Sequence, residues 1–204
     1  MGLFSRKKEQ SSDDASKWLQ KGNEFCNLGK YEDAIKCLDK AIKINPHDAV
    51  AYHEKSRILH TLRKHKDAIK CLDKAIKIYP DDWYAWYGKG MVYFFQHRYE
   101  DAIKCYDRSI EIDPNYANAL EFKGWAFSYL GKYEDAIKCY DRSIEIDPDN
   151  MHIWKYKGDA LYNLGKYEDA IKCYDRSIEI DPDNTWIEHH SAKKLALKKL
   201  NKHE

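Results

Sequence analysis

The chain contains 204 residues, with 35 Lys and Arg against 34 Asp and Glu, which leaves a formal net charge of +1. A charge this close to zero argues against a nucleic-acid partner, because general nucleic-acid binders neutralise phosphates with an excess of cations. The chain has no run of 18 apolar residues, so no stable membrane insertion is expected. Aromatic residues make up 14%, which favours a folded chain over a disordered one.

The start of the chain, MGLFSRKKEQSSDD, lacks the apolar stretch of a secretory signal. Six cysteines without such a signal are expected to be reduced thiols, and the expected location is cytoplasmic. We expect residues 1–14 to form a flexible tail that mixes basic and acidic residues. Arg6 stands where N-myristoylation requires Ser or Thr, and Leu3 and Phe4 could contact a membrane only weakly.

A spacing of 34 residues runs through the rest of the chain and is marked by the five prolines, Pro46, Pro80, Pro114, Pro148 and Pro182. The block GKYEDAIKCYDRSIEIDPDN occurs at 131–150 and again, unchanged, at 165–184. A fixed period in this range predicts stacked supersecondary units. With proline at position 32 of each repeat, the five repeats are 15–48, 49–82, 83–116, 117–150 and 151–184.

Each repeat predicts two helices, at about positions 2–14 and about positions 18–31. Residues that cap a helix start stand just before the first helix in four places, namely Asp48, Asp82, Asn150 and Asn184. A glycine that can adopt a left-handed conformation separates the two helices at Gly29, Gly131 and Gly165. Arg63 and His97 occupy that slot in repeats two and three, so we expect less regular turns there.

Residues 185–204 predict one further helix that caps the last repeat. Ile187, Ala192, Leu195 and Leu200 are expected to face the repeat, while the lysines of this segment stay in water. A solubilising cap is the simpler interpretation, and a basic helix for an acidic partner is the alternative.

The repeats resemble the tetratricopeptide repeat (TPR), whose pattern is W-x2-L-G-x2-Y, then A-x3-F, then P. Repeat three carries this pattern at Trp86, Gly90, Tyr93, Ala102, Tyr106 and Pro114. The resemblance implies an all-α fold, a right-handed solenoid of five 34-residue helical hairpins plus a C-terminal capping helix. One departure is systematic, because lysine replaces the usual leucine at position 7 in all five repeats. A lysine there can bury its stem and extend its ammonium group to water.

The TPR resemblance also implies that the first helix of each repeat lines a concave groove. The second helices are nearly identical in repeats three to five, whereas every first helix differs, which indicates a shared scaffold and an individual groove. Aromatic residues gather at the groove positions of repeats three to five and are typical anchors for a peptide or helix. The predicted partner-binding residues are Tyr84, Tyr87, Phe94, Phe122, Trp125, Tyr129, Tyr156 and Tyr162. The same groove positions do not reproduce the cationic clamp of the TPR proteins that bind chaperone tails.

No P-loop, dinucleotide fingerprint, HExxH or nucleophile elbow is present, so we expect neither an enzyme nor a cofactor. No CxxC or CxxH pair is present either, so no metal site is expected. The sequence therefore favours a non-enzymatic scaffold that binds a protein or peptide partner. Two alternatives stay open, a self-assembling structural repeat protein with the groove unused and a metal- or membrane-associated adaptor. The oligomeric state is unknown from the sequence.

Overall fold

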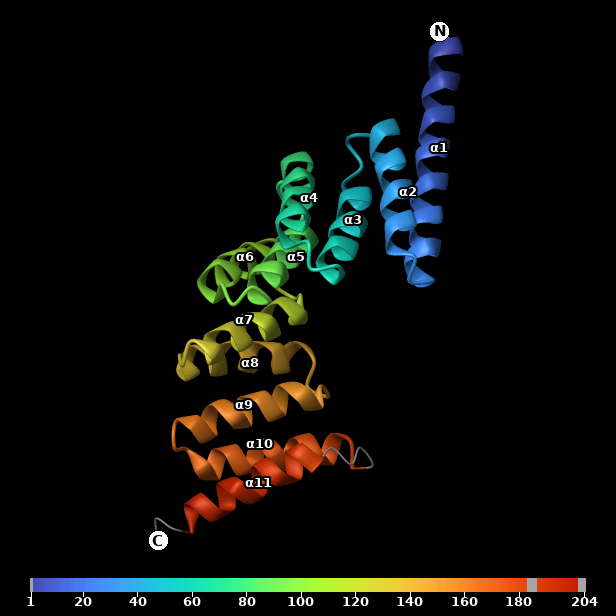
Figure 1. The fold of residues 1–204 in the computed structure, drawn as a ribbon. Helices are drawn as coiled ribbons and strands as arrows, with labels where there is room; N and C mark the ends of the chain where they lie inside the picture. The colour runs from blue at the N-terminus through green and yellow to red at the C-terminus, as the bar shows by residue number, and fades with distance from the viewer. Residues whose placement is uncertain (1, 183–186, 202–204) are drawn as a thin grey trace. The chain divides into compact units, whose positions relative to one another are not determined.

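The computed structural model describes residues 2–182 and 187–201, and side chains from residue 13 onward except those of 183–188 and 202–204. In this part of the chain there are eleven α-helices and no strands, which confirms the all-α prediction (Figure 1). The chain divides into two compact units, residues 1–96 and 97–204. The division falls in the turn between the two helices of the third repeat, and each unit is described by itself.

The first unit holds α1 (Gly2–Asn27), α2 (Tyr31–Ile44), α3 (Ala49–Thr61), α4 (His65–Ile78) and α5 (Trp83–Phe94). Helices α1 and α2 form one antiparallel hairpin, and α3 and α4 form the next. Ile58 of α3 is buried against Ala34 and Leu38 of α2, so the core runs from one hairpin into the next. A second cluster joins α4 to α5 through Leu72 and Val92. Stacking between neighbouring hairpins therefore supplies the core of this unit.

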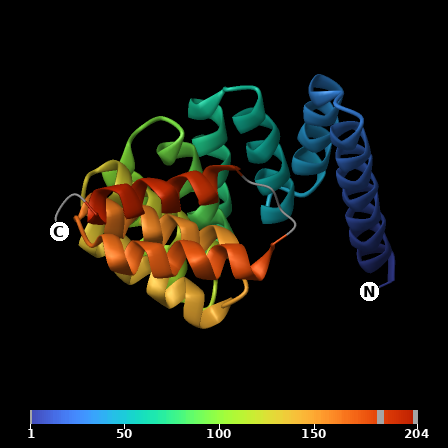
Figure 2. The ribbon, with the colours of Figure 1, turned by 90° about the horizontal axis from the view of Figure 1, so that it is seen from below.

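The second unit holds α6 (Tyr99–Ile112), α7 (Ala117–Tyr129), α8 (Tyr133–Ile146), α9 (Met151–Asn163), α10 (Tyr167–Ile180) and α11 (Ile187–Leu200). Helices α7 to α11 follow one another as successive layers (Figure 1). Tyr140 of α8 packs with Ile153 and Ala160 of α9, which repeats the arrangement of the first unit. Helix α11 lies beside α10 (Figure 2).

The turns inside the hairpins share one backbone conformation whether or not glycine is present. Gly29, Gly131 and Gly165 have φ angles of 71°, 71° and 75°, as predicted. Arg63 and His97 reach φ angles of 57° and 60° in the same slot. The Arg63 and Lys64 N–H groups donate to the carbonyls of His60 and Leu59, in the pattern that Gly29 and Lys30 make after α1. The prediction of less regular turns is therefore wrong. Arg63 and His97 adopt the left-handed conformation that glycine adopts at the other turns.

Three of the four predicted caps lie within the described residues, and their side chains cap α3, α5 and α9 as predicted. The Asp48 carboxylate accepts from the Val50 and Ala51 N–H groups at 3.0 and 3.3 Å. Asp82 accepts from Ala85, and Asn150 accepts from His152. These bonds satisfy donors that a helix start leaves without a partner. The fourth predicted cap, Asn184, lies outside the described residues.

The lysines at position 7 do not simply reach water, as we had expected, but form ion pairs between repeats. In repeats two to five, the lysine meets an aspartate 16 residues earlier, on the second helix of the preceding repeat. The Nζ–Oδ1 distances run from 2.5 to 2.7 Å in the pairs Lys55–Asp39, Lys89–Asp73, Lys123–Asp107 and Lys157–Asp141. Lys193 of α11 pairs with Asp175 in the same way and extends the series to the capping helix. The aspartates are partly exposed, so each pair contributes only about 0.2–1 kcal/mol.

The two ends of the chain differ in part from the expectations. Helix α1 begins at Gly2, so residues 2–14 are helical here, and their flexibility stays a prediction. In α11, Ala196 is fully buried and Ala192 partly buried, whereas Leu195 is 55% exposed. The expectation that Leu195 faces the repeat is wrong, because the helix is rotated so that Ala196 occupies the inner position. Ile187 lies at the start of the helix, and its side chain is outside the described residues.

A buried histidine fixes α11 to the last repeat. His189 is 4% exposed, and its Nδ1 lies 2.7 Å from the Ser177 hydroxyl. That hydroxyl donates its one proton to the carbonyl of Met151 at 2.7 Å. Nδ1 of His189 must therefore carry the proton that it shares with Ser177. The bond ties α11 to α10 and, through Met151, to the start of α9.

Candidate functional site

The eight predicted binding residues divide between the two units. Three lie on α5 in the first unit, and five lie on α7 and α9 in the second. On α5, Tyr84 is 41% exposed, whereas Tyr87 and Phe94 are buried. In the second unit Tyr129 is 67% exposed, and partial exposure is shared by Phe122, Trp125, Tyr156 and Tyr162. Six of the eight side chains thus keep exposed surface.

In the first unit, Tyr84 belongs to a polar aromatic group at the start of α5. Its ring meets the His53 ring edge-on at 5.4 Å between centroids. His53 Nε2 lies 2.9 Å from Asp82 Oδ2, and Asp82 also caps α5. Burial alone would raise the pKa of Asp82, but hydrogen bonds from His53 and the Ala85 N–H outweigh it and hold this pKa below its usual value. Tyr84 therefore lies beside the His53–Asp82 pair at the start of α5.

In the second unit the rings form a continuous cluster from α7 to α9. The Phe122 and Trp125 centroids are 4.6 Å apart, and those of Trp125 and Tyr156 are 4.9 Å apart and nearly perpendicular. Tyr129 stacks on Tyr99 of α6 at 5.1 Å with an interplanar angle of 4°. Tyr162 lies apart from the cluster, against Tyr167. The structure thus brings together three of the predicted residues, Phe122, Trp125 and Tyr156, in one aromatic cluster.

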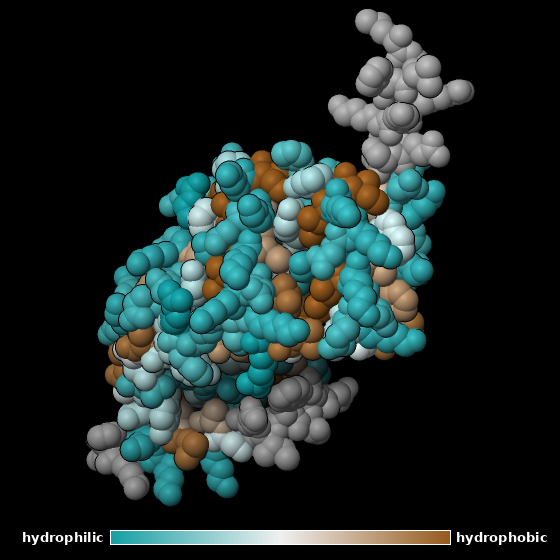
Figure 3. Space-filling view, turned by 45° about the horizontal axis from the view of Figure 1, so that its top comes forward, coloured by the Kyte–Doolittle hydropathy of each residue, from teal (hydrophilic) through white to brown (hydrophobic). Residues whose placement is uncertain are grey.

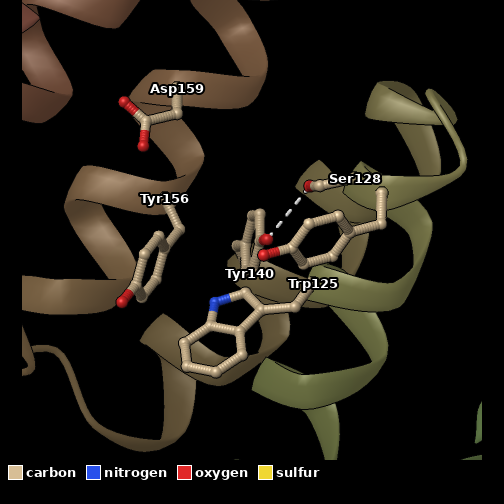
Figure 4. A pocket seen from close by; sticks show the side chains of 6 residues that line it. Trp125, Ser128, Tyr140, Tyr156 and Asp159 are labelled. Atoms are coloured by element: carbon tan, nitrogen blue, oxygen red, sulfur yellow. Dashed lines mark hydrogen bonds between the residues drawn. The ribbon is translucent and has the colours of Figure 1, made fainter. Parts of the chain in front are cut away.

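A cleft of about 330 Å³ opens beside this cluster, between α7 and α9, with α8 beneath (Figure 4). Its lining residues are Trp125, Ser128, Tyr129, Tyr140, Tyr156 and Asp159. Figure 4 shows Tyr156 and Asp159 on one wall, Trp125 and Ser128 on the other, and Tyr140 between them. A volume of this size suits a single large side chain or a small ligand. The face drawn in Figure 3 is mostly hydrophilic, with apolar residues in separate patches.

Tyr140 reaches this cleft from the second helix of its repeat because Gly124 leaves room for its ring. A Cβ atom at Gly124 would lie 2.4 Å from Tyr140 Cε1, which is closer than side chains approach one another. The Tyr140 hydroxyl shares a hydrogen bond with the Ser128 hydroxyl at 3.1 Å. Burial raises the pKa of Tyr140, so it stays a neutral phenol. The floor of the cleft is therefore uncharged.

Asp159 is the acidic residue of the cleft, and its charge is already balanced within the chain. Its Oδ1 accepts from the Tyr174 hydroxyl at 3.0 Å, and its Oδ2 accepts from Lys155 Nζ at 2.9 Å. The same Lys155 Nζ lies 5.3 Å from the centroid of the Tyr156 ring, within cation–π distance. Lys155 therefore interacts with two residues that line the cleft, the Asp159 carboxylate and the Tyr156 ring.

A second acidic side chain, Glu121, lies on α7 one turn before Trp125. It is half-buried, and burial raises its pKa to about 7. Sequence reasoning did not select Glu121, Ser128 or Tyr140. A sequence does not show which side chains become buried, or that a side chain of the second helix reaches the cleft. The position of Glu121 on the groove side of its helix was the one signal that could have found it.

Two cysteines of the second unit are not activated thiols. Cys139 and Cys173 are buried, and burial raises the pKa of each to about 11. Thiols with a pKa this high are poor nucleophiles at neutral pH. Among the described side chains, no three His, Cys, Asp or Glu residues come together in a way that could hold a metal ion. Over the same part of the chain, no helix is both long enough and apolar enough to cross a membrane.

Three family models described as tetratricopeptide repeat match the chain, at residues 15–48 and 83–116, at 49–82, and at 123–185. A comparison with curated protein sequences gives no match.

Among solved structures, MamA is 22% identical with a TM-score of 0.75, and the alignment covers 83% of this chain and 93% of MamA. YrrB, described as a TPR protein with an unusual peptide-binding site, is 22% identical with a TM-score of 0.73, over 94% of this chain and 98% of YrrB. TTC0263, a thermophilic TPR protein of Thermus thermophilus, is 18% identical with a TM-score of 0.66, over 90% of this chain and 98% of TTC0263. At these identities the likenesses show the fold, a helical solenoid of repeats.

Proposed function

Because the chain belongs to the tetratricopeptide repeat family, a class of protein–protein interaction scaffolds, we propose that it binds a peptide or helix of a partner protein along the first helices of its second unit. The aromatic cluster of α7 and α9 would anchor the partner, and no catalytic step is involved. The observation that carries the proposal is the cleft beside Trp125 and Tyr156, where large rings stay partly exposed. Partly exposed Trp and Tyr in a concave site are typical binding hot spots.

The chemistry of the cleft supports a peptide as the ligand. Aromatic rings provide a large apolar contact, while the hydroxyls of Ser128 and Tyr140 offer hydrogen bonds that can fix the direction of a bound chain. YrrB, which has the same fold, is described as having a peptide-binding site, and this likeness adds support without locating the site here. Proteins of this family generally act without catalysis, which agrees with a binding role.

Self-assembly through the N-terminal end is the weaker alternative. In repeats two to five, positions 3 and 10 of the first helix are apolar and buried against the preceding repeat, as at Ala51 and Ile58. In the first repeat the same positions hold Lys17 and Glu24, which are exposed. Another repeat stacked on this face would bury both charges, and such burial is costly without well-placed partners. The outer face of α1 is therefore suited to water.

The test begins with random peptides displayed on phage and selected against the intact chain. A selected peptide should lose at least about tenfold in affinity for Trp125→Ala, because truncating a hot-spot residue costs more than about 1.4 kcal/mol. Tyr129→Ala, whose side chain is 67% exposed, should weaken binding without affecting the fold. Tyr79→Ala is the matched control, since Tyr79 is an equally large, 59% exposed ring outside the first helices.

Isothermal titration measures the affinities, and circular dichroism checks that each variant is folded. Loss of binding in the two groove variants with unchanged binding to Tyr79→Ala supports the proposal. Selection of no peptide, or equal binding to all three variants, contradicts it. Light scattering over a concentration series would then show whether self-assembly replaces peptide binding.

A further inference from the structure

We propose that the aromatic cluster of the second unit receives a lysine or arginine side chain of the partner segment, with the Glu121 carboxylate as its counter-ion. The inference deepens the proposed function and rests on it, because it names the chemistry of the segment in the groove. Glu121 adjoins Phe122 in α7 and stands one turn from Trp125. The rings of these two neighbours are 4.6 Å apart. Because residues four apart lie on the same face of a helix, Glu121 and Trp125 share one face of α7.

Glu121 is a half-buried acid to which the described residues bring neither a basic side chain nor a hydrogen-bond donor. Burial is the cause of its raised pKa of about 7, and no neighbouring charge contributes. The carboxyl group is therefore protonated in about half of the molecules at neutral pH. A cation brought beside it would favour the ionised form and gain an ion pair in a partly water-excluded place.

The equivalent positions on α9 show how this chain balances a groove acid. Position 5 of the repeat is Glu121 on α7 and Lys155 on α9, while position 9 is Trp125 on α7 and Asp159 on α9. On α9 the two positions form an internal ion pair at 2.9 Å. On α7 the acid instead faces an aromatic residue, so its cation has to come from elsewhere. Repeat four thus lacks the partner that repeat five supplies internally.

The rings beside Glu121 favour a cation with an apolar stem over other occupants. Lysine and arginine place their methylene groups on aromatic surface and their charge over ring faces. The chain makes this contact itself, since Lys40 Nζ lies 3.9 Å from the Trp18 ring centroid and Lys157 Nζ lies 5.6 Å from that of Trp154. An acidic segment would be repelled by Glu121. A wholly apolar segment would bury Glu121 further and force its protonation.

The test compares phage-displayed random peptides selected against the wild-type chain with those selected against Glu121→Gln. Peptides that need Trp125 should be enriched in Lys or Arg for the wild type, and this enrichment should disappear for Glu121→Gln. Replacing the enriched arginine of one such peptide by citrulline, a neutral isostere, should reduce affinity for the wild type about tenfold or more. The same replacement should have little effect on binding to Glu121→Gln, because the two changes remove the same interaction.

The affinity of the arginine peptide should also depend on pH. The bound cation lowers the pKa of Glu121, so binding releases a proton and strengthens as pH rises through about 7. Between about pH 6 and about pH 8 the ionised fraction of a group with this pKa rises close to tenfold, and affinity should follow it. Of the groups on neighbouring elements, the Tyr140 phenol on α8 interacts electrostatically with Glu121, and α9 carries His152 and the Lys155–Asp159 pair. Any contribution of these other groups to the pH dependence persists in Glu121→Gln and is measured separately there.

The outcomes separate the two proposals. Trp125-dependent peptides without Lys or Arg, or equal affinity for wild type and Glu121→Gln, overturn the cation proposal and leave the groove intact. Selection of no Trp125-dependent peptide overturns both. Enrichment of a basic residue that is lost in Glu121→Gln, together with a pH dependence that the variant lacks, supports the cation site.

Discussion

The hairpins of the two units differ at core position 24 of the repeat, on the second helix. In the first unit this residue is leucine, Leu38 in repeat one and Leu72 in repeat two. In the second unit it is tyrosine, Tyr140 in repeat four and Tyr174 in repeat five. All four side chains are at most 2% exposed, so each one packs in the core of its hairpin.

The tyrosines add a polar end that leucine lacks, and that end reaches the first helix of the hairpin. Tyr140 bonds to Ser128 and Tyr174 bonds to Asp159, and both of these partners line the cleft. The position that opens this route is number 8 on the first helix, which is glycine at Gly124. The residue at core position 24 therefore shapes the cleft, because a tyrosine there bonds to residues that line it.

The largest expected effect comes from closing that route with Gly124→Ala. The added Cβ would lie 2.4 Å from the Tyr140 ring, so the helices must separate and the free energy of unfolding should fall by about 1–3 kcal/mol. In the first unit, Gly22→Ala places the Cβ 3.0 Å from Leu38 Cγ, which can shift. The gain in helix propensity of up to about 1 kcal/mol should offset that strain, leaving stability nearly unchanged. Urea unfolding monitored by circular dichroism measures both.

A double variant, Gly124→Ala with Tyr140→Leu, copies the arrangement of the first unit into the second. It should recover most of the stability that Gly124→Ala loses, while the cleft loses its hydroxyl floor. Equal destabilisation by Gly124→Ala and Gly22→Ala would contradict the idea that the tyrosine ring at position 24 is what requires glycine at position 8.

Local signals in the sequence predicted the repeat architecture well. The proline spacing, the caps at Asp48 and Asp82 and the glycine turns depend on neighbours within a few residues, and the structure confirms them. The position-7 lysines were misjudged because their aspartates lie 16 residues away on another helix. Leu195 was misplaced because a short apolar pattern does not fix helix rotation to within one residue.

The candidate site was predictable only in its aromatic half. Phe122, Trp125 and Tyr156 follow from position within the repeat, and the structure brings their rings together. Glu121 and Tyr140 take their importance from burial and from the gap at Gly124, which exist only after helices pack. Chemistry that depends on local spacing was therefore accessible from sequence, whereas chemistry that depends on desolvation was not.

A smaller effect should follow from removing the phenol hydroxyls one at a time. Tyr174→Phe deletes a donor to the charged Asp159, so the free energy of unfolding should fall by about 1–2 kcal/mol. Tyr140→Phe deletes a bond to a neutral, partly exposed hydroxyl and should lose only about 0.5–1 kcal/mol. Thermal unfolding of both variants measures the difference. The opposite order would mean that Lys155 alone satisfies Asp159 and that the hydroxyl adds nothing.

The turns provide the smallest contrast, between Arg63 in the first unit and the glycines at two turns of the second unit. Arg63 holds the left-handed conformation that Gly131 and Gly165 adopt in the second unit. A non-glycine residue costs roughly 1–2 kcal/mol in this region, and glycine avoids that cost while losing more entropy on folding. Arg63→Gly should therefore raise the free energy of unfolding by about 0.5–1 kcal/mol, whereas Gly131→Ala should lower it by a similar amount. Urea unfolding of the two variants measures both changes. If Arg63→Gly is destabilising instead, contacts of the Arg63 side chain, and not backbone conformation, decide the residue at this turn.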